Sequence, residues 1–324
     1  MPGAQLDPQA RALIERVAAS NAPPMHALSA PEARRVYRET RAALAPAPPA
    51  VAEVRELSIP GPAGLLRARL YRYAAGNGPL PGVVYFHGGG WIYGDLDTHD
   101  TVCRGIADQG CCAVVSVEYR LAPEHKFPSS VEDSVAATRW VAAHAAALGI
   151  DASRLAVAGD SAGGNLAAVV ALTLRDQGGP PLVMQVLVYP VTDQAADAGS
   201  HLSFAEGYLL TREDMLWVRK NYLRDERDAA DWRASPLRAS DLSRLPPAYV
   251  ITAGFDPLRD EGNAYAGRLT LAGVPVTLEC FEGQVHGFLV MGGVMAAAHH
   301  ALARIGQMLR TVFGTGPVLR PRTA

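Results

Sequence analysis

The feature that most limits how this chain can fold is the stretch LAVAGDSAGGNLAAVVAL at residues 155–172. An apolar run ends at Gly159, a single serine follows at Ser161, and an alanine-rich segment begins directly after it. This order predicts a buried strand that turns sharply into a helix, with the serine at the corner. A serine held in a strained backbone conformation crowds the residues two before and two after it. Glycine at Gly159 and Gly163 is expected to relieve that clash.

The same corner is suited to nucleophilic chemistry. The pattern G-x-S-x-G between a strand and a helix is the context that a nucleophilic serine requires. The N-terminus of the following helix directs N–H groups and a positive dipole end toward Ser161, which favours developing negative charge. The alternative is a glycine-rich turn or a phosphate-binding loop, but neither G-x-G-x-x-G nor G-x-x-x-x-G-K-[ST] occurs in this stretch.

A second glycine cluster, YFHGGGWIYGD at residues 85–95, follows the apolar run GVVYFH. Consecutive glycines let a backbone approach a substrate closely and aim its N–H groups at an oxyanion. We expect Gly88 and Gly89 to donate in this way, with the N–H of Ala162 as a further donor. The cluster lies about 70 residues before Ser161, where the oxyanion loop of a hydrolase fold belongs.

A serine hydroxyl needs a general base, and the base needs a carboxylate to orient it. In this fold the chain order is serine, acid, histidine, and four of the nine histidines follow Ser161, namely His201, His286, His299 and His300. His286 comes just after the predicted strand PVTLECF, from where it can reach the carboxyl edge of the sheet. The other three lie in a helical pattern or in a long interval between strands. We predict that His286 is the base.

Two carboxylates could orient that histidine. Asp256 follows the predicted strand AYVIT, and Pro257 with the next helix fixes its turn. Asp193 follows the earlier run VLVYP and is the alternative. Asp260 and Glu261 fall in the first turn of a predicted helix, where an acidic residue usually has a capping role. We favour Asp256.

Alternation of strands and helices predicts an α/β fold with a doubly wound, mostly parallel sheet. Residues 66–73 alternate apolar with polar residues, as a half-buried antiparallel strand does, whereas the later apolar runs do not alternate and are typical of central strands covered on both faces. Helical patterns occupy residues 98–108, 130–148, 162–177, 259–271 and 294–313.

The chain divides into a core and accessory segments. Residues 1–50 predict two helices, one capped by Asp7 and one by Ser29 with Glu32, followed by a proline-rich linker. Residues 193–237 are too long for a simple crossover and are expected to be an insertion that packs with the N-terminal helices. Residues 51–192 and 238–313 then form the core, and residues 314–324 a tail.

Composition excludes several classes of function. The net charge of −2 and the lack of a basic run give no case for nucleic acid. No secretory signal and no apolar run of about 20 residues is present. The four cysteines form no C-x-x-C pair and no zinc spacing, so we expect no metal site, buried thiols at Cys111 and Cys112, and a cytoplasmic setting. A homodimer is a further hypothesis, because PVTLECF is expected near a sheet edge.

Five motifs in combination resemble the hormone-sensitive-lipase-like esterases of the α/β-hydrolase superfamily, the bacterial family IV group. They are HGGGW, YRLAPEHKFP, GDSAGGNLA, DPLRDEG and VHGF, and the resemblance spans about Val54 to Phe313. It implies an eight-stranded sheet, a helical cap, no cofactor, and hydrolysis of short- to medium-chain acyl esters by way of an acyl-enzyme. It also implies that Asp160 supports the HGGG loop from behind.

Some assignments stay open at this level. Trp91, Tyr189 and Leu209 are expected to be walls of the substrate pocket, with ordinary core packing an equal alternative for each. An amidase or deacetylase of the same fold shares the acyl-enzyme chemistry and is the main rival to an esterase. A non-catalytic ligand-binding relative would lack a working histidine, and the presence of Ser161, Asp256 and His286 argues against it.

Overall fold

The computed structural model describes residues 5–74, 78–195 and 199–316 of the chain. Its centre is one eight-stranded sheet in the order β1-β2-β4-β3-β5-β6-β7-β8. β1 and β2 pair antiparallel, β2 pairs antiparallel with β4, and the remaining neighbours are parallel. The strands are β1 (Glu53–Gly61), β2 (Gly64–Arg72), β3 (Leu80–Phe86), β4 (Ala113–Val117), β5 (Ile150–Asp160), β6 (Met184–Val188), β7 (Ala248–Phe255) and β8 (Val276–Val285).

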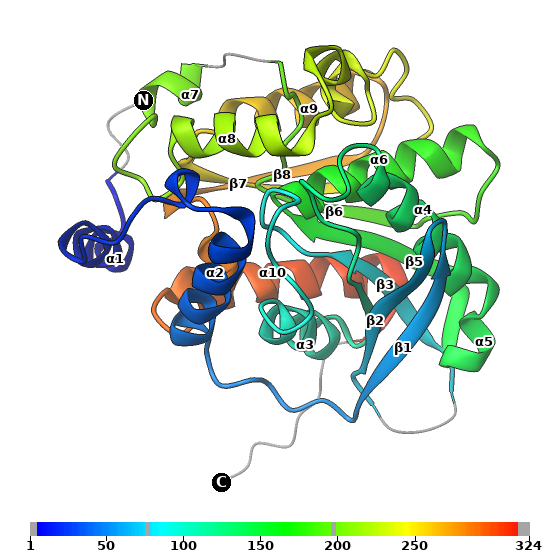
Figure 1. The fold of residues 1–324 in the computed structure, drawn as a ribbon. Helices are drawn as coiled ribbons and strands as arrows, with labels where there is room; N and C mark the ends of the chain where they lie inside the picture. Colours follow the sequence, from blue (N-terminus) through cyan, green and yellow to red (C-terminus); the bar gives the residue numbers. More distant parts are fainter. Residues whose placement is uncertain (1–4, 75–77, 196–198, 317–324) are drawn as a thin grey trace, which may run out of the picture.

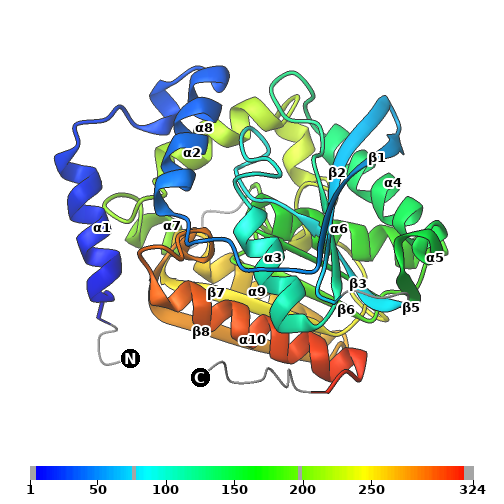
Figure 2. The same ribbon diagram turned by 90° about the horizontal axis from the view of Figure 1, so that it is seen from below.

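Helices cover both faces of the sheet, as Figures 1 and 2 show. α3 (Asp100–Gly110) and α10 (Ala296–Phe313) pack together on one face, and α4 (Ser129–Ala143), α6 (Ala162–Asp176) and α9 (Arg259–Leu271) lie on the other. The short helix α5 (Ala145–Leu148) follows α4 after a break at His144. The predicted α/β architecture and its central parallel strands are therefore confirmed. Across the described residues no helix combines the length and the apolar character needed to cross a bilayer.

The parallel register brings the predicted motifs to one edge of the sheet. Phe86, at the end of β3, is the register partner of Gly159 near the end of β5. The glycine loop after β3 therefore lies beside the corner that carries the serine. At the far side of the sheet, Phe255 of β7 pairs with Val285 of β8. The residues that directly follow these two strands are consequently neighbours too.

Residues 5–50 contain the two expected helices. α1 (Pro8–Ala19) begins at Asp7, whose carboxylate accepts hydrogen bonds from the N–H groups of the first turn. α2 (Ala30–Leu44) begins after Ser29, whose N–H donates to Glu32 at 3.1 Å. A 3₁₀ turn, η1 (Met25–Ala27), connects them. Residues 317–324 of the predicted tail lie outside the described residues.

The interval 193–237 contains helices and, in the part that is described, no strand. Its elements are α7 (Gly199–Ser203), α8 (Arg212–Tyr222), η2 (Glu226–Ala230) and η3 (Pro236–Arg238). His26 of η1 contacts the start of α8, with Nδ1 2.9 Å from Asp214 and Nε2 3.0 Å from Glu213. The N-terminal segment and the insertion thus meet directly where η1 contacts α8.

The first strand of the sheet was not predicted. β1 carries mostly exposed or half-buried side chains over residues 53–61, and Ile59 is its one fully buried residue. It lacks the apolar run that identified the other strands because it is an edge strand that pairs only with β2. Its place depends on backbone hydrogen bonds to β2, and the residue pattern of 53–61 does not reveal them.

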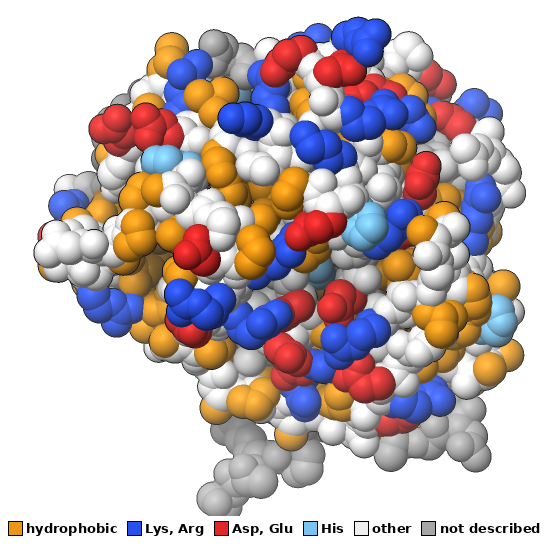
Figure 3. Space-filling model, viewed as in Figure 1, with side chains coloured by type: hydrophobic (Ala, Val, Ile, Leu, Met, Phe, Trp, Pro, Cys, Tyr) orange, Lys and Arg blue, Asp and Glu red, His pale blue; other side chains and the backbone are white. Residues whose placement is uncertain are grey.

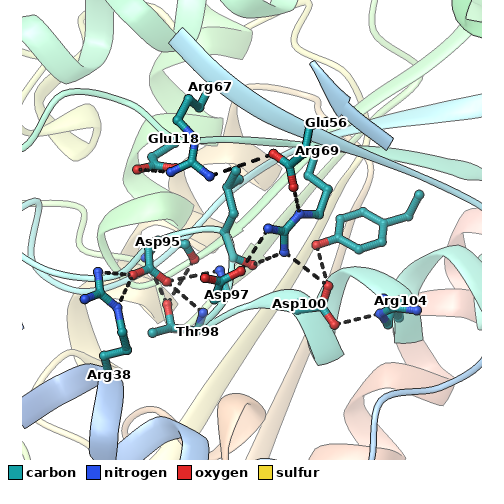
Figure 4. A network of polar contacts seen from close by, with 12 residues as sticks. Arg38, Glu56, Arg67, Arg69, Asp95, Asp97, Thr98, Asp100, Arg104 and Glu118 are labelled. Atoms are coloured by element: carbon teal, nitrogen blue, oxygen red, sulfur yellow. Dashed lines mark hydrogen bonds and ion pairs between the residues drawn. The ribbon is translucent and has the colours of Figure 1, made fainter. Parts of the chain in front are cut away.

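A network of ion pairs joins α2 to the polar end of the sheet (Figure 4). Arg38 of α2 pairs with Asp95, which follows the glycine loop, at 2.7 Å. Arg69 of β2 pairs with Asp97 at 2.8 Å and with Glu56 of β1 at 2.5 Å. Single exposed pairs contribute little to stability, about 0–1 kcal/mol. The network instead helps to fix the relative positions of α2, the segment after the glycine loop and the β1–β2 hairpin.

Candidate active site

Ser161 occupies the corner between β5 and α6 in a strained backbone conformation, with φ 56° and ψ −118°. Its N–H donates to the carbonyl of Val188 on β6 at 2.8 Å, which holds the corner against the sheet. A Cβ on Gly159 would lie 2.2 Å from the carbonyl oxygen of Gly163, and a Cβ on Gly163 would lie 1.9 Å from that of Phe86. The predicted need for glycine at both positions is confirmed, because neither site has room for a side chain.

Ser161, His286 and Asp256 form one hydrogen-bonded chain. His286 Nε2 lies 2.9 Å from Ser161 Oγ, and His286 Nδ1 lies 2.8 Å from Asp256 Oδ2. Asp256 is fully buried just after β7, and its other oxygen accepts the N–H of Leu258 at 2.8 Å. With Nδ1–H donated to the carboxylate, Nε2 is left to accept the serine proton.

Asp193 and His201 line the same cavity as Ser161, but the alternative acid and the other histidines have other partners or are exposed. Asp193 pairs with Arg238, whose Nε is 2.7 Å from Oδ1, and not with His286. His201 is buried and its Nε2 lies 2.8 Å from Glu261. His299 and His300 are exposed on α10. Of the residues weighed from the sequence, Asp256 and His286 alone are brought to Ser161.

The glycine loop differs from the expectation at one position. The N–H of Gly88 donates to Asp160 Oδ1 at 2.9 Å, so it is not available to an oxyanion. Gly89 and Gly90 line the cavity beside Ser161, and among the described residues their N–H groups have no hydrogen-bond acceptor. The structure contradicts the expectation for Gly88, and the N–H of Gly90 becomes a candidate donor beside that of Gly89. In the sequence nothing distinguishes Gly88, Gly89 and Gly90 from one another. The structure distinguishes them, because the buried carboxylate of Asp160 accepts the N–H of Gly88 only.

Asp160 lies buried behind the glycine loop. Its Oδ1 accepts the hydroxyl of Tyr85 at 2.6 Å in addition to the Gly88 N–H, and His99 Nε2 lies 3.3 Å away. Burial by itself would raise the pKa of Asp160, but the nearby His99 and the hydrogen bonds from His99 and Tyr85 bring that pKa below its usual value. The carboxylate is thus ionised at neutral pH and is a strong acceptor for the loop. Tyr85 and His99 had no assigned role from the sequence.

A cavity of about 320 Å³ opens onto Ser161 and His286. Trp91 and Leu209 line it. Trp91 is only 1 % exposed and stacks on Tyr222 with ring centroids 4.0 Å apart, so the alternative of core packing also holds for it. Tyr189 does not line it. Its side chain is 1 % exposed and packs behind His286, with ring centroids 4.7 Å apart, so the expectation of a pocket wall there is wrong. The position of Tyr189 at the end of a strand does not by itself show whether its ring faces the cavity or packs behind His286.

The cavity wall also contains Glu261, for which a capping role was expected, and Arg41, which sequence reasoning missed. Glu261 is buried, accepts the N–H of Thr192 at 2.6 Å, and pairs with His201. Burial raises the pKa of Glu261, although the hydrogen bonds from His201 and Thr192 oppose the rise. Arg41 of α2 lines the same cavity. Among the described residues, no three His, Cys, Asp or Glu side chains gather in an arrangement that could hold a metal ion. Cys111 and Cys112 are buried free thiols, as predicted.

Comparison with known proteins shows the family to which the chain belongs. Residues 83–290 match the family described as alpha/beta hydrolase fold. The chain is 49 % identical to the carboxylic ester hydrolase LipN of Mycobacterium tuberculosis over 266 residues, covering 79 % of this chain and 70 % of the relative. It is 39 % identical to the ethyl acetate hydrolase of Pseudomonas putida, covering 94 % of this chain and 98 % of the relative.

Among solved structures, this fold is similar to the ester hydrolase EH1AB1 from the metagenome of Lake Arreo, solved in complex with a bipyridine phosphonate derivative. The TM-score is 0.94 at 41 % sequence identity, and the match covers 96 % of this chain and all of the other. The motifs, the eight-stranded sheet and these relatives agree with one another. The chain belongs to the hormone-sensitive-lipase-like carboxylesterases of the α/β-hydrolase superfamily.

Proposed function

We propose that this carboxylesterase hydrolyses short- to medium-chain acyl esters through a serine acyl-enzyme, with Ser161 as nucleophile, His286 as general base and Asp256 as the orienting acid. The observation that carries the proposal is the continuous chain from Ser161 Oγ through the imidazole to Asp256, at 2.9 and 2.8 Å. Nucleophile and base within hydrogen-bond reach, with the base held by a third group, is the geometry that activates a serine.

The reaction has two halves. Ser161 Oγ attacks the ester carbonyl while His286 Nε2 takes the hydroxyl proton, and the N–H groups of Gly89, Gly90 and Ala162 stabilise the oxyanion. The imidazolium then protonates the departing alcohol, which leaves the acyl group on Ser161. A water molecule, deprotonated by His286, attacks this acyl-enzyme, and collapse of the second tetrahedral species releases the acid and restores the serine. Asp256 holds the imidazole in the required tautomer throughout.

The size of the cavity supports short and medium acyl groups. At about 320 Å³ it lies at the small end of the range for ligand pockets, roughly 300–1,000 Å³. Side chains of α8, including Met215 and Val218, close it on one side, and Tyr37 of α2 contributes from the N-terminal segment. Lengthening the acyl chain should raise kcat/KM while methylenes are buried and lower it once the cavity is full.

We further propose that residues 1–50 and 193–237 act together as a cap over the core, formed by residues 51–192 and 238–313. The contacts of His26 with Glu213 and Asp214 support this division. The partner is a small ester, and nucleic acid is not expected, since Lys and Arg are interspersed with Asp and Glu on the face seen in Figure 3. The cytoplasmic setting stays a prediction from the sequence.

The proposal is tested by covalent labelling. A fluorophosphonate probe should add one adduct to the protein, and peptide mapping should place it on Ser161. Ser161→Ala should remove both the adduct and the hydrolysis of p-nitrophenyl butyrate. Ser243→Ala is a matched control, because Ser243 lies in a surface segment where its N–H donates to Asp241 and its carbonyl accepts from Arg175. An adduct elsewhere, or full activity in Ser161→Ala, would overturn the assignment.

A rate panel separates the esterase from its rivals. p-Nitrophenyl esters of increasing acyl length and the matched p-nitroanilides are compared on the same enzyme preparation. We expect the esters to be preferred throughout, with an optimum at short or medium length. Preference for the anilides would indicate an amidase. Tight ligand binding without turnover of any ester would indicate a non-catalytic relative.

A further inference from the structure

Arg41 lies in the last turn of α2 and contributes to the wall of the cavity that holds Ser161 and His286. Its guanidinium lies over the ring of Tyr37, with 4.7 Å between its Cζ and the ring centroid. A Cβ built on Gly287 would be 3.9 Å from Arg41 Nη2. Because Gly287 directly follows His286, the guanidinium lies close to the segment that carries the candidate base.

The guanidinium has donors without acceptors. Nε and Nη1 of Arg41 are buried and have no hydrogen-bond partner among the described residues, where no ion pair involves Arg41 and the polar partner of its guanidinium is the Tyr37 side chain. Other charged side chains of the cavity wall are paired. Their partners are Arg238 for Asp193, His201 for Glu261, His26 for Asp214, Glu226 for Arg219 and His99 for Asp160, while Arg212 has an interaction of its own. Arg41 is therefore a cation of the cavity wall that has no ion-pair partner among the described residues.

This arrangement is costly unless something accepts from it. A buried donor left unsatisfied costs about 1–3 kcal/mol, and more when the group is charged. A cation in the last turn of a helix interacts favourably with the helix dipole, but that interaction does not satisfy the hydrogen-bonding capacity of Nε and Nη1. The planar guanidinium has two donor edges, Nε with Nη2 and Nη1 with Nη2, and either edge can bind both oxygens of a carboxylate.

We propose that Arg41 binds a carboxylate carried by the ester itself, so that the preferred substrates are anionic esters rather than simple alkyl esters. This inference rests on the proposed function of Ser161, since it concerns the same cavity. The carboxylate can belong to the acyl part, as in a monoester of a dicarboxylic acid, or to the alcohol part, as in an acylated hydroxy acid. In both cases the ester is bound by its charge at Arg41 and cleaved at Ser161.

The test compares each anionic ester with a neutral ester of nearly the same shape. Monoethyl glutarate is paired with ethyl glutaramate for the acyl side, and O-acetyl lactate with O-acetyl lactamide for the alcohol side. The wild-type protein should have a higher kcat/KM for the anion in at least one pair. In Arg41→Gln the anion-to-amide ratio of that pair should fall roughly 10- to 100-fold, as expected for one charge-assisted interaction.

Two variants on the same helix serve as controls. Arg35→Gln removes an exposed arginine that pairs with Glu39, away from the cavity wall, and should keep the wild-type ratio. Arg41→Lys keeps the charge but loses the planar pair of donors, and should give an intermediate ratio. The pair that loses its preference identifies the side of the ester that carries the carboxylate.

Two results would overturn the inference. One is a wild-type protein that shows no preference for the anion in either pair. The other is an Arg41→Gln variant that loses the same factor on the anion and on its amide, because that would mean a packing role on Tyr37. Failure of the proposed function gives a different result, namely p-nitrophenyl butyrate hydrolysis that survives Ser161→Ala.

Discussion

The carboxylate of Asp160 and the backbone N–H of Gly88 are joined by a hydrogen bond of 2.9 Å, although 72 residues separate them in the chain. The bond ties the residue before the nucleophile corner to the first glycine of the loop after β3. It therefore fixes the distance between the serine and the next two glycines, whose N–H groups are the proposed oxyanion donors. A neighbour of the serine thus orients the loop without touching the substrate.

Replacing Asp160 should impair the oxyanion loop. In Asp160→Ala the Gly88 N–H and the Tyr85 hydroxyl lose their acceptor, and we expect kcat to fall by about 10²-fold or more, the scale of one lost oxyanion donor. KM should change much less, because the cavity walls remain. Asp160→Asn keeps one acceptor oxygen, so its kcat should lie between that of the wild type and that of Asp160→Ala. Steady-state kinetics on p-nitrophenyl butyrate measure this, and equal changes in kcat and KM would argue against a loop effect.

The two candidate acids are separated by matched amide substitutions. Asp256→Asn should lower kcat by about 10⁴-fold, because an amide cannot hold His286 in the tautomer that accepts the serine proton. Asp193→Asn removes a partner of Arg238 and should cost less than tenfold. Both variants are first checked for an unchanged circular dichroism spectrum. A larger loss in Asp193→Asn than in Asp256→Asn would reverse the assignment.

The glycine two residues after the serine should tolerate no side chain. A Cβ on Gly163 would lie 1.9 Å from the carbonyl oxygen of Phe86, and backbone cannot move aside as a flexible side chain can. We expect Gly163→Ala to lower the free energy of unfolding by about 3 kcal/mol or more. Gly267 of α9 has no heavy atom within 4 Å of its Cβ position, so Gly267→Ala should raise it by up to about 1 kcal/mol. Urea unfolding measures both, and similar values would contradict the packing argument.

Acid should destabilise the fold through His87. Burial and the neighbouring His99 lower the pKa of His87 from 6.5 to about 4. Between these values the unfolded chain binds a proton that the folded protein does not. The free energy of unfolding should therefore fall as the pH drops from about 6.5 to about 4, by on the order of 3 kcal/mol from this group, and its contribution should be constant above that window.

Urea unfolding at several pH values tests this dependence. The pH slope should be smaller in His87→Gln, which has no titrating ring, than in the wild type. His144→Gln is the control, since His144 lies on the exposed side of the break between α4 and α5. An identical slope in His87→Gln and the wild type would show that other groups carry the acid sensitivity.

The homodimer hypothesis concerns the open edge of β8. Asp7 N–H donates to the carbonyl of Gly283 at 2.9 Å, so the N-terminal segment covers one end of this edge strand. Leu278, 45 % exposed, lies farther along the strand. If two copies pair through β8, Leu278→Asp should convert a dimer to a monomer in light scattering coupled to size exclusion. A monomeric wild-type protein would remove the hypothesis.

Local patterns were enough for the strands β2 to β8 and for the main helices of the core, because burial on two faces produces apolar runs and helices produce periodicity. They were also enough to place Ser161, since the clash that requires Gly159 and Gly163 arises within a few residues. They did not identify β1, whose exposed side chains carry no apolar pattern. The helix predicted over 130–148 is interrupted at His144.

By itself the sequence determined the α/β fold, the corner that presents the serine, and the order of Asp256 and His286 after it, because these depend on local backbone geometry and on which strand each residue follows. Only the tertiary structure decided that Asp160 engages Gly88 and leaves Gly89 and Gly90 free, that Tyr189 lies behind His286, and that the guanidinium of Arg41 reaches the cavity. Each of these contacts joins segments far apart in the chain. Which of several similar polar groups are paired depends on their distances and burial in the folded protein. The spacing of residues along the sequence does not give these distances.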